Sequence, residues 1–249
     1  MKIDIPGAFV DAWALFRRHQ QVLVALAGVF IFLPTLWLLL YVPAAPPLPD
    51  QSAPDAQVQL QVKVFAEWVT ANSGTFLIAA LMSLYGSLSI CMFFLDRGSE
   101  DVRAAMIRAI GQLPRLALAS FLISIPASVG LLALALPGLY VLGRTMLVVP
   151  VLAAERRQTA LAAIWRSLML TRGNGLVLAA LAGLGFVAGQ ILPSPFTSLA
   201  DAMSAGHAAN PVMMMILNTL ASLAATIVAL ATVLLRVAIY RRVGSISGI

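Results

Sequence analysis

The chain has 249 residues, of which 61% are hydrophobic and only 10% are charged, and its mean hydropathy is +0.94. Soluble domains carry about a quarter charged residues, so this composition excludes a soluble protein and predicts an all-α polytopic membrane protein of one domain. The net charge of +6 comes from arginines at the ends of apolar runs, which favours anionic lipid headgroups over nucleic acid as the partner. We therefore expect no nucleic-acid partner.

The start of the chain predicts an interfacial helix followed by a membrane span. Residues 3–19 place apolar side chains at helical spacing, with Trp13 at headgroup depth and charged residues on the other side. Residues 22–42 form an apolar run long enough to cross the hydrocarbon core as a helix. Pro34 lies within this first span and predicts a kink in it.

The segment after the first span is expected on the outer side of the membrane. Residues 43–57 are rich in proline, which predicts an extended loop. Residues 57–71 alternate at first and then show helical spacing, so an interfacial helix is favoured and a short strand is the alternative. The second span is expected at 74–95, where small residues suit close contact between helices.

An inner amphipathic segment is predicted at 96–115, with Ser99 as the residue that caps its helix. The third span follows at 116–136, and the pair Pro137–Gly138 predicts a tight reversal. The fourth span, 139–154, is about 24 Å long as a helix. Because this is shorter than the hydrocarbon core, it predicts local thinning of the bilayer or burial inside the helix bundle.

Thr159 is expected to cap a third inner amphipathic segment, and the sequence TRGNG at 171–175 is expected to end it. The fifth span is predicted at 176–192, where glycine and alanine allow a neighbouring backbone to come close. Residues 193–211 are expected to form a polar outer loop. The sixth span, 212–240, is longer than one bilayer thickness, which predicts tilt or a protruding end.

The arginines set the orientation of these six spans. Of the 16 Lys and Arg residues, only Lys63 falls on the outer side when both termini are placed inside, while Arg144 and Arg236 fall within spans. The positive-inside rule therefore predicts that both termini lie in the cytoplasm.

The inner face is the best candidate for a binding site, because arginine recognises phosphate and tryptophan prefers the headgroup boundary. We expect Glu155 to pair with Arg166 or Arg172 and to order the third amphipathic segment, with independent solvated charges as the alternative. The expected partners are anionic headgroups of membrane lipids, other membrane proteins or a second copy of the chain. The candidate binding residues are Trp13, Arg17, Arg18, Arg103, Arg108, Arg115, Arg156, Arg157, Trp165, Arg166 and Arg172.

Polar residues inside the spans are functional candidates by default. Arg144 is expected either to reach the nearest headgroups or to face the helix bundle, and Arg236 is expected to reach the headgroups. For Gln190 and Asn218, hydrogen bonds between helices are favoured over contacts with a substrate.

The stretch from Pro137 to Gly173 combines special residues in a fixed order within apolar sequence. It has the Pro137–Gly138 pair, Arg144 in the following span, Pro150, Glu155, and the segment 163–173 with Trp165, Arg166, Ser167, Leu170, Thr171 and Gly173. In these residues it resembles the membrane domain associated with some bacterial glycerophosphoryl diester phosphodiesterases and related six-span inner-membrane proteins. The resemblance implies a six-span architecture in the bacterial inner membrane. The hydrolase of that family is a separate soluble barrel, for which this chain has no room, so the resemblance does not imply phosphodiesterase activity here.

No catalytic or metal-binding motif stands out. His19 and His207 are expected on opposite sides of the membrane, and Cys91 is the single cysteine, so we expect no metal, no cofactor and no enzyme activity. The leading hypothesis is a non-enzymatic membrane protein that organises lipids or partner membrane proteins through its inner face. The alternative is a transporter or channel for a small or lipidic anion, with Arg144 at the pathway.

Overall fold

The computed structural model describes residues 4–47, 55–95, 101–155, 158–205 and 210–246. All regular structure in these residues is helical, and six helical segments are long and apolar enough to cross a membrane. The all-α polytopic fold is therefore confirmed. The six segments are Ile5–Tyr41, Asp55–Leu95, Val102–Ala133, Leu136–Ala154, Gly175–Ser204 and Pro211–Gly244.

The first membrane segment consists of three consecutive helical parts: α1 (Ile5–Ala27), a π-helical turn (Gly28–Phe32) and α2 (Leu33–Tyr41). His19 has non-helical backbone angles inside α1, so a kink separates the expected interfacial segment from the expected span. Pro34 has no N–H to donate to the carbonyl four residues earlier. That carbonyl lies in the π-helical turn, which places the predicted distortion just before the proline.

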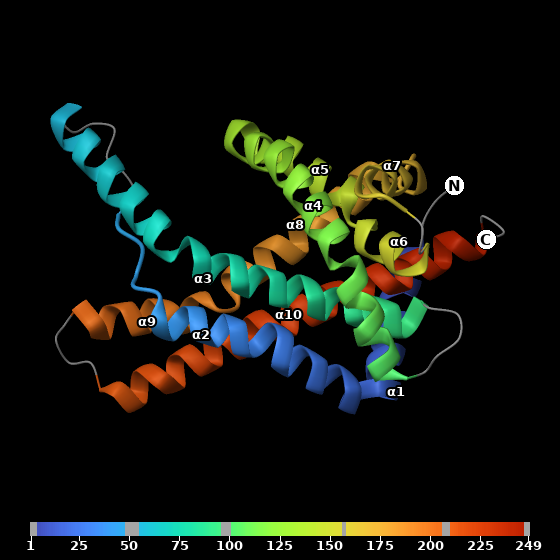
Figure 1. The fold of residues 1–249 in the computed structure, drawn as a ribbon, viewed down its shortest axis with the longest axis horizontal. Helices are drawn as coiled ribbons and strands as arrows, with labels where there is room; N and C mark the ends of the chain where they lie inside the picture. The colour runs from blue at the N-terminus through green and yellow to red at the C-terminus, as the bar shows by residue number, and fades with distance from the viewer. Residues whose placement is uncertain (1–3, 48–54, 96–100, 156–157, 206–209, 247–249) are drawn as a thin grey trace.

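The second span continues into a long arm, because α3 (Asp55–Leu95) is one helix of 41 residues. At 1.5 Å per residue it is about 60 Å long, twice the hydrocarbon thickness. The helix favoured at 57–71 is confirmed and the strand alternative is excluded, but this helix runs on into the second span without a break. The polar residues between arm and span bond back to their own helix, as Asn72 does to the Trp68 carbonyl at 2.8 Å. In Figure 1 the arm projects away from the other helices.

The inner amphipathic segment and the third span also form one helix, α4 (Val102–Leu134). Asp101 caps it by accepting the Arg103 N–H at 3.0 Å, whereas the expected cap, Ser99, lies outside the described residues. The chain then reverses at Ala135, which has a φ of 58°. The reversal was predicted at Pro137–Gly138, but this pair lies in the first turn of the next helix. Proline is tolerated there, because the N–H groups of a first helical turn have no partner within the helix.

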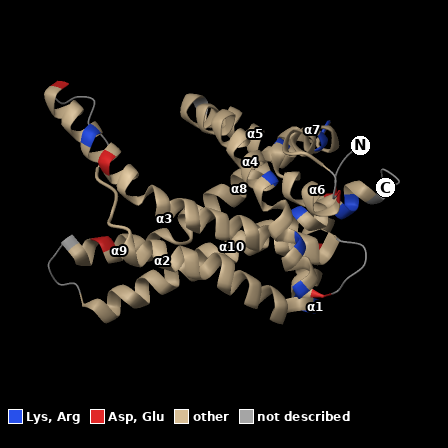
Figure 2. Ribbon diagram, viewed as in Figure 1, with Lys and Arg blue, Asp and Glu red and all other residues tan. Residues whose placement is uncertain are grey.

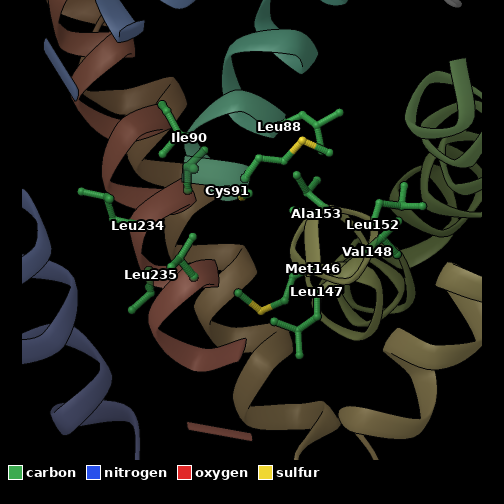
Figure 3. Packing of buried hydrophobic residues seen from close by; sticks show 14 of the residues in the cluster. Leu88, Ile90, Cys91, Met146, Leu147, Val148, Leu152, Ala153, Leu234 and Leu235 are labelled. Atoms are coloured by element: carbon green, nitrogen blue, oxygen red, sulfur yellow. The ribbon is translucent and has the colours of Figure 1, made fainter. Parts of the chain in front are cut away.

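The fourth span is broken into α5 (Leu136–Thr145) and α6 (Val148–Ala154). Pro150 explains the break, because it has no N–H for the Met146 carbonyl and its ring crowds that carbonyl. Val148 to Ala153 are all buried, which confirms the predicted burial inside the bundle. Figure 3 shows this segment facing buried side chains of α3 and α10.

The remaining helices are α7 (Ala160–Leu170), α8 (Gly175–Ile191), α9 (Ser194–Ala205) and α10 (Pro211–Ile246). The cap predicted at Thr159 is confirmed, since its hydroxyl accepts the Ala162 N–H at 3.3 Å. The prediction of an outer loop at 193–211 was wrong, because α9 occupies most of it and packs on α10. That packing buries Ala200, which gives the short helix a tertiary reason to form.

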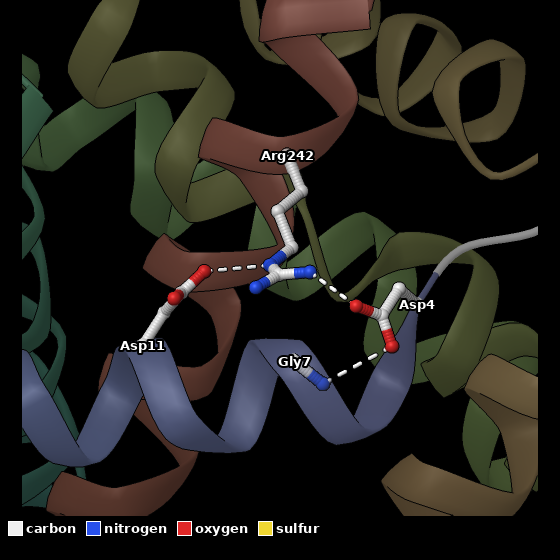
Figure 4. A network of polar contacts seen from close by, with 4 residues as sticks. All are labelled: Asp4, Gly7, Asp11 and Arg242. Atoms are coloured by element: carbon white, nitrogen blue, oxygen red, sulfur yellow. Dashed lines mark hydrogen bonds and ion pairs between the residues drawn. The ribbon is translucent and has the colours of Figure 1, made fainter.

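The two described chain ends lie at the same end of the molecule. Arg242 of α10 donates to Asp11 of α1 from Nε at 2.6 Å and to Asp4 from Nη1 at 2.6 Å, as Figure 4 shows. Lys and Arg gather at this end, around α1, α6 and α7 (Figure 2). The arm of α3, at the opposite end, contains Lys63 as its one described basic residue. The charge asymmetry predicted along the sequence is therefore present in the fold.

Candidate functional site

Helix α7 presents an apolar stripe away from the protein. Leu161, Trp165 and Met169 lie four residues apart and are 68%, 62% and 43% exposed. The opposite face of α7 is buried through small residues, including Ala163 and Ser167. A helix that packs its small residues inward and exposes its large apolar ones has the form of an interfacial membrane helix.

The arginine-bearing ends of α1 and α4 show the same arrangement. In α1, Phe9, Val10 and Trp13 are exposed while Ala8 and Ala12 are buried. In α4, two exposed isoleucines, Ile107 and Ile110, lie between Arg103 and Arg115. Three separate helices therefore expose apolar residues at the basic end of the molecule. We call these exposed apolar residues and their flanking arginines the basic face.

The predicted arginines of the basic face fall into distinct groups. Arg166 forms an ion pair with Glu155, and Arg108 is partly buried. Arg156 and Arg157 lie outside the described residues. The others have exposed side chains and are Arg17, Arg18, Arg103, Arg115 and Arg172.

Glu155 forms the centre of a polar cluster at the basic end of the bundle. Its Oε1 accepts from Arg166 Nε at 3.2 Å and from Tyr240 Oη at 3.3 Å, and its Oε2 accepts from Gln158 Nε2 at 2.9 Å. The predicted Glu155–Arg166 pair is confirmed, and Arg172 takes no part in it. Because the carboxylate lies between α6, α7 and α10, it fixes α7 to the bundle.

Arg144 lies at the break in the fourth span and binds α7 from both its side chain and its backbone. Its Nη2 donates to the Leu168 carbonyl at 2.7 Å. Its own carbonyl accepts from Ser167 Oγ at 2.8 Å and from Thr171 Oγ1 at 3.3 Å. These contacts place Arg144 against the helix bundle, the second of its two predicted environments. They also satisfy a carbonyl that the end of α5 leaves without a helical donor.

Two glycines allow the helices around Arg144 to come close. A side chain at Gly143 would overlap the backbone of Leu178 and Ala179 in α8. A side chain at Gly175 would overlap Tyr140 and crowd Arg144. The ring of Tyr140 in turn lies under the guanidinium of Arg144, with 5.8 Å from Cζ to the ring centroid.

Hydrogen bonds between the first and sixth spans involve one predicted residue and one that the sequence reasoning missed. Asn218 Nδ2 donates to the Leu39 carbonyl at 3.4 Å, as predicted for a polar residue between helices. Ser222 Oγ donates to the Phe32 carbonyl at 2.9 Å, at the end of the π-helical turn. The hydrogen bond predicted for Gln190 is not formed within the described residues, because this side chain is exposed near the end of α8.

The acidic partners of Arg242 were also missed. Asp4 and Asp11 are far from Arg242 in sequence. No local sequence pattern could therefore link the start of α1 to the end of α10. Arg241 is held in a similar way, since its Nη2 donates to the Phe94 carbonyl at 2.7 Å. A cation at the last carbonyls of α3 suits a helix C-terminus.

In the described residues, no group of three His, Cys, Asp or Glu side chains could hold a metal ion. Comparisons with protein-family models, with curated proteins and with solved structures find no match to this chain. The resemblance to the phosphodiesterase-associated membrane domain therefore stays a prediction. What the fold does establish is a multi-pass arrangement of six apolar segments with its described basic residues concentrated at one end.

Proposed function

We propose that this protein is a non-enzymatic component of the bacterial inner membrane that gathers anionic lipids on its basic face. In this proposal both termini and the basic face lie on the cytoplasmic side. The exposed stripe on α7 carries the proposal, because Leu161, Trp165 and Met169 leave much of their apolar surface uncovered by the described residues. Lipid at headgroup depth suits such a stripe, since it provides both acyl chains and phosphates.

The charges beside the stripe suit the same ligand. Arg172 follows directly on α7, and Arg17 and Arg18 follow the exposed residues of α1. Each arginine near an anionic surface contributes about 1 kcal/mol toward binding it. Arg166 is excluded from this set, because Glu155 already neutralises it. The lipid-binding role therefore belongs to the exposed arginines.

The experiment is to reconstitute the full chain in nanodiscs of mixed neutral and anionic lipid and to measure the lipids retained after detergent extraction by native mass spectrometry. The test variant carries Arg17→Gln, Arg18→Gln, Arg103→Gln and Arg172→Gln together. The control is Lys63→Gln, which removes a positive charge from the opposite end of the molecule. Anionic enrichment should fall at least about fivefold in the test variant and stay unchanged in the control.

Equal enrichment in the wild-type protein and the test variant would contradict the proposal. The same spectra report protein stoichiometry. A second protein retained in place of lipid, whether a partner membrane protein or another copy of this chain, would assign the basic face to protein binding instead.

Transport of a small or lipidic anion is the second candidate function, and the break in the fourth span favours it. Broken helices in transporters place binding sites near the middle of the membrane, and Arg144 lies two residues before Met146, where the break begins. The contact between Arg144 and the Leu168 carbonyl argues for a structural role instead. Anion flux into proteoliposomes that Arg144→Ala abolishes would favour transport, and flux equal to that of empty vesicles would exclude it for the anions tested.

A further inference from the structure

Arg236 is an arginine inside the bundle that no described residue neutralises. It lies in α10, and its Nε is buried without a hydrogen-bond partner. Its neighbours in the helix, Val233, Val237 and Ile239, are almost fully buried. Cys91 of α3 is the titratable group beside it, and this thiol is itself buried. The guanidinium therefore has an apolar environment in which the described residues place no carboxylate.

The acidic side chains described at this end of the molecule are already engaged. Glu155 accepts from Arg166 and Tyr240, and Asp4 and Asp11 both accept from Arg242. An ionised group in a low-dielectric interior is strongly destabilising unless an opposite charge compensates it. An arginine at this position is therefore expected to have a counter-charge from outside the chain.

The position of Arg236 is suited to an anion that enters from the basic face. Arg241 marks the inner end of α10, because it binds the last turn of α3. Arg236 precedes it by five residues, which is about 7.5 Å along the helix axis, close to the length of one arginine side chain. Arg236 is partly exposed as a residue although its Nε is buried. Part of this residue therefore reaches the surface of the described structure about 7.5 Å along α10 from Arg241.

We propose that Arg236 binds the phosphate of one anionic lipid from the inner leaflet, as a fixed site of one lipid per chain. This inference rests on the proposed lipid-binding function and adds a single residue and a stoichiometry to it. The planar guanidinium presents paired donors that match a phosphate. The acyl chains of the same lipid would lie against the apolar surface of the bundle. The site differs from the basic face, where the exposed arginines hold lipids at the surface.

The experiment is to titrate a short-chain phosphatidylglycerol into the purified, delipidated full chain and to count bound lipids by native mass spectrometry. The test variant is Arg236→Met, which keeps an unbranched side chain, removes the guanidinium and fits apolar surroundings. The matched control is Lys63→Met, which removes an exposed positive charge at the opposite end of the molecule. We expect one tightly bound lipid in the wild-type protein and in Lys63→Met. The affinity of that lipid should fall about 10- to 100-fold in Arg236→Met, as for the loss of a charge-assisted contact.

Thermal unfolding gives a second readout, because the difference in Tm between Arg236→Met and the wild-type protein should change sign when lipid is added. In neutral detergent alone, Arg236→Met should raise the Tm, because it removes an uncompensated buried charge. With phosphatidylglycerol present, the wild-type protein should gain stability and the variant should not. Inorganic phosphate at the same concentration separates the two sources of the anion. A Tm gain from inorganic phosphate as large as that from lipid would overturn the assignment to a lipid.

Equal lipid affinity in the wild-type protein and Arg236→Met would also overturn the inference. This failure is distinguishable from failure of the proposed function. The four-arginine variant tests enrichment by the basic face, and Arg236→Met tests one site below it. Arg236→Lys should retain part of the affinity, because it keeps the charge but loses the paired donors.

Discussion

Arg144 and Ser167 join the broken fourth span to the interfacial helix, because Ser167 Oγ donates to the Arg144 carbonyl at 2.8 Å. Ser167 is fully buried, so this carbonyl has little access to water. The guanidinium of the same arginine returns a hydrogen bond to the Leu168 carbonyl at 2.7 Å. The end of α5 and the end of α7 are therefore held together by reciprocal hydrogen bonds between two elements that follow one another closely in the chain.

Ser167→Ala should lower the stability of the protein by about 1–2 kcal/mol, because it removes a buried donor from a carbonyl that needs one. Thermal unfolding in a fixed detergent measures the effect. Ser124→Ala is the control, since the Ser124 hydroxyl is exposed and bonds only within its own helix. Equal Tm values for the two variants would show that the contact between α5 and α7 contributes nothing to stability.

Gly143→Ala should destabilise the protein by about 1–3 kcal/mol, because the added methyl group would force α5 away from the backbone of α8. Gly111→Ala is the matched control in another helix, where a methyl group meets nothing within 4 Å. Its effect should be neutral or stabilising by about 0.5–1 kcal/mol. If Gly143→Ala is as stable as the control, α5 and α8 do not approach as closely as described.

Glu155→Gln should loosen α7 from the bundle, because it leaves Arg166 without its carboxylate. Hydrogen exchange of the α7 amides measures the change, and we expect faster exchange across Ala160–Leu170 than in the wild-type protein. Glu67→Gln removes a carboxylate that pairs only with the exposed Lys63, so it should leave exchange in α7 unaltered. Identical exchange in both variants would mean that the Glu155 cluster does not hold the helix.

Asp11 and Arg242 should show a small favourable coupling in a double-mutant cycle, as expected for a partly exposed ion pair. The cycle uses Asp11→Asn, Arg242→Gln and the double variant. The coupling should weaken at high salt, since screening acts on exposed charges. Zero coupling at low salt would indicate that α1 and α10 are held together without this pair.

The six apolar spans follow from composition, because lipid forces apolar segments to be helical. Their orientation stays a prediction of the positive-inside rule, since the arginines gather on one side of the spans. The cap at Thr159 and the pair of Glu155 with Arg166 were also predictable, since their signals are local in sequence. Pro150 is a local signal for the break in the fourth span, but it was interpreted only as one of the residues of the family resemblance. Residues 139–154 were therefore interpreted as one helix, because their apolar run is continuous.

Other features depend on contacts between distant segments. Helix α9 forms where a polar loop was expected, because packing on α10 stabilises a short helix that composition does not favour. The chain reverses at Ala135, which has a positive φ, and not at the Pro-Gly pair that normally signals a reversal. The ion pairs of Arg242 with Asp4 and Asp11 join the helices at the two ends of the described chain. No periodicity in a single sequence encodes such a long-range pair.

The most direct test of the account is the side of the membrane on which the arginine-rich end lies. In a Cys91→Ala background, Gly111→Cys places a thiol on the exposed inner part of α4, and Leu199→Cys places one on the exposed face of α9. A membrane-impermeant maleimide added to intact bacterial cells should label Leu199→Cys at once and Gly111→Cys only after permeabilisation. Labelling of Gly111→Cys in intact cells, with Leu199→Cys protected, would contradict the orientation and with it a cytoplasmic lipid-binding face.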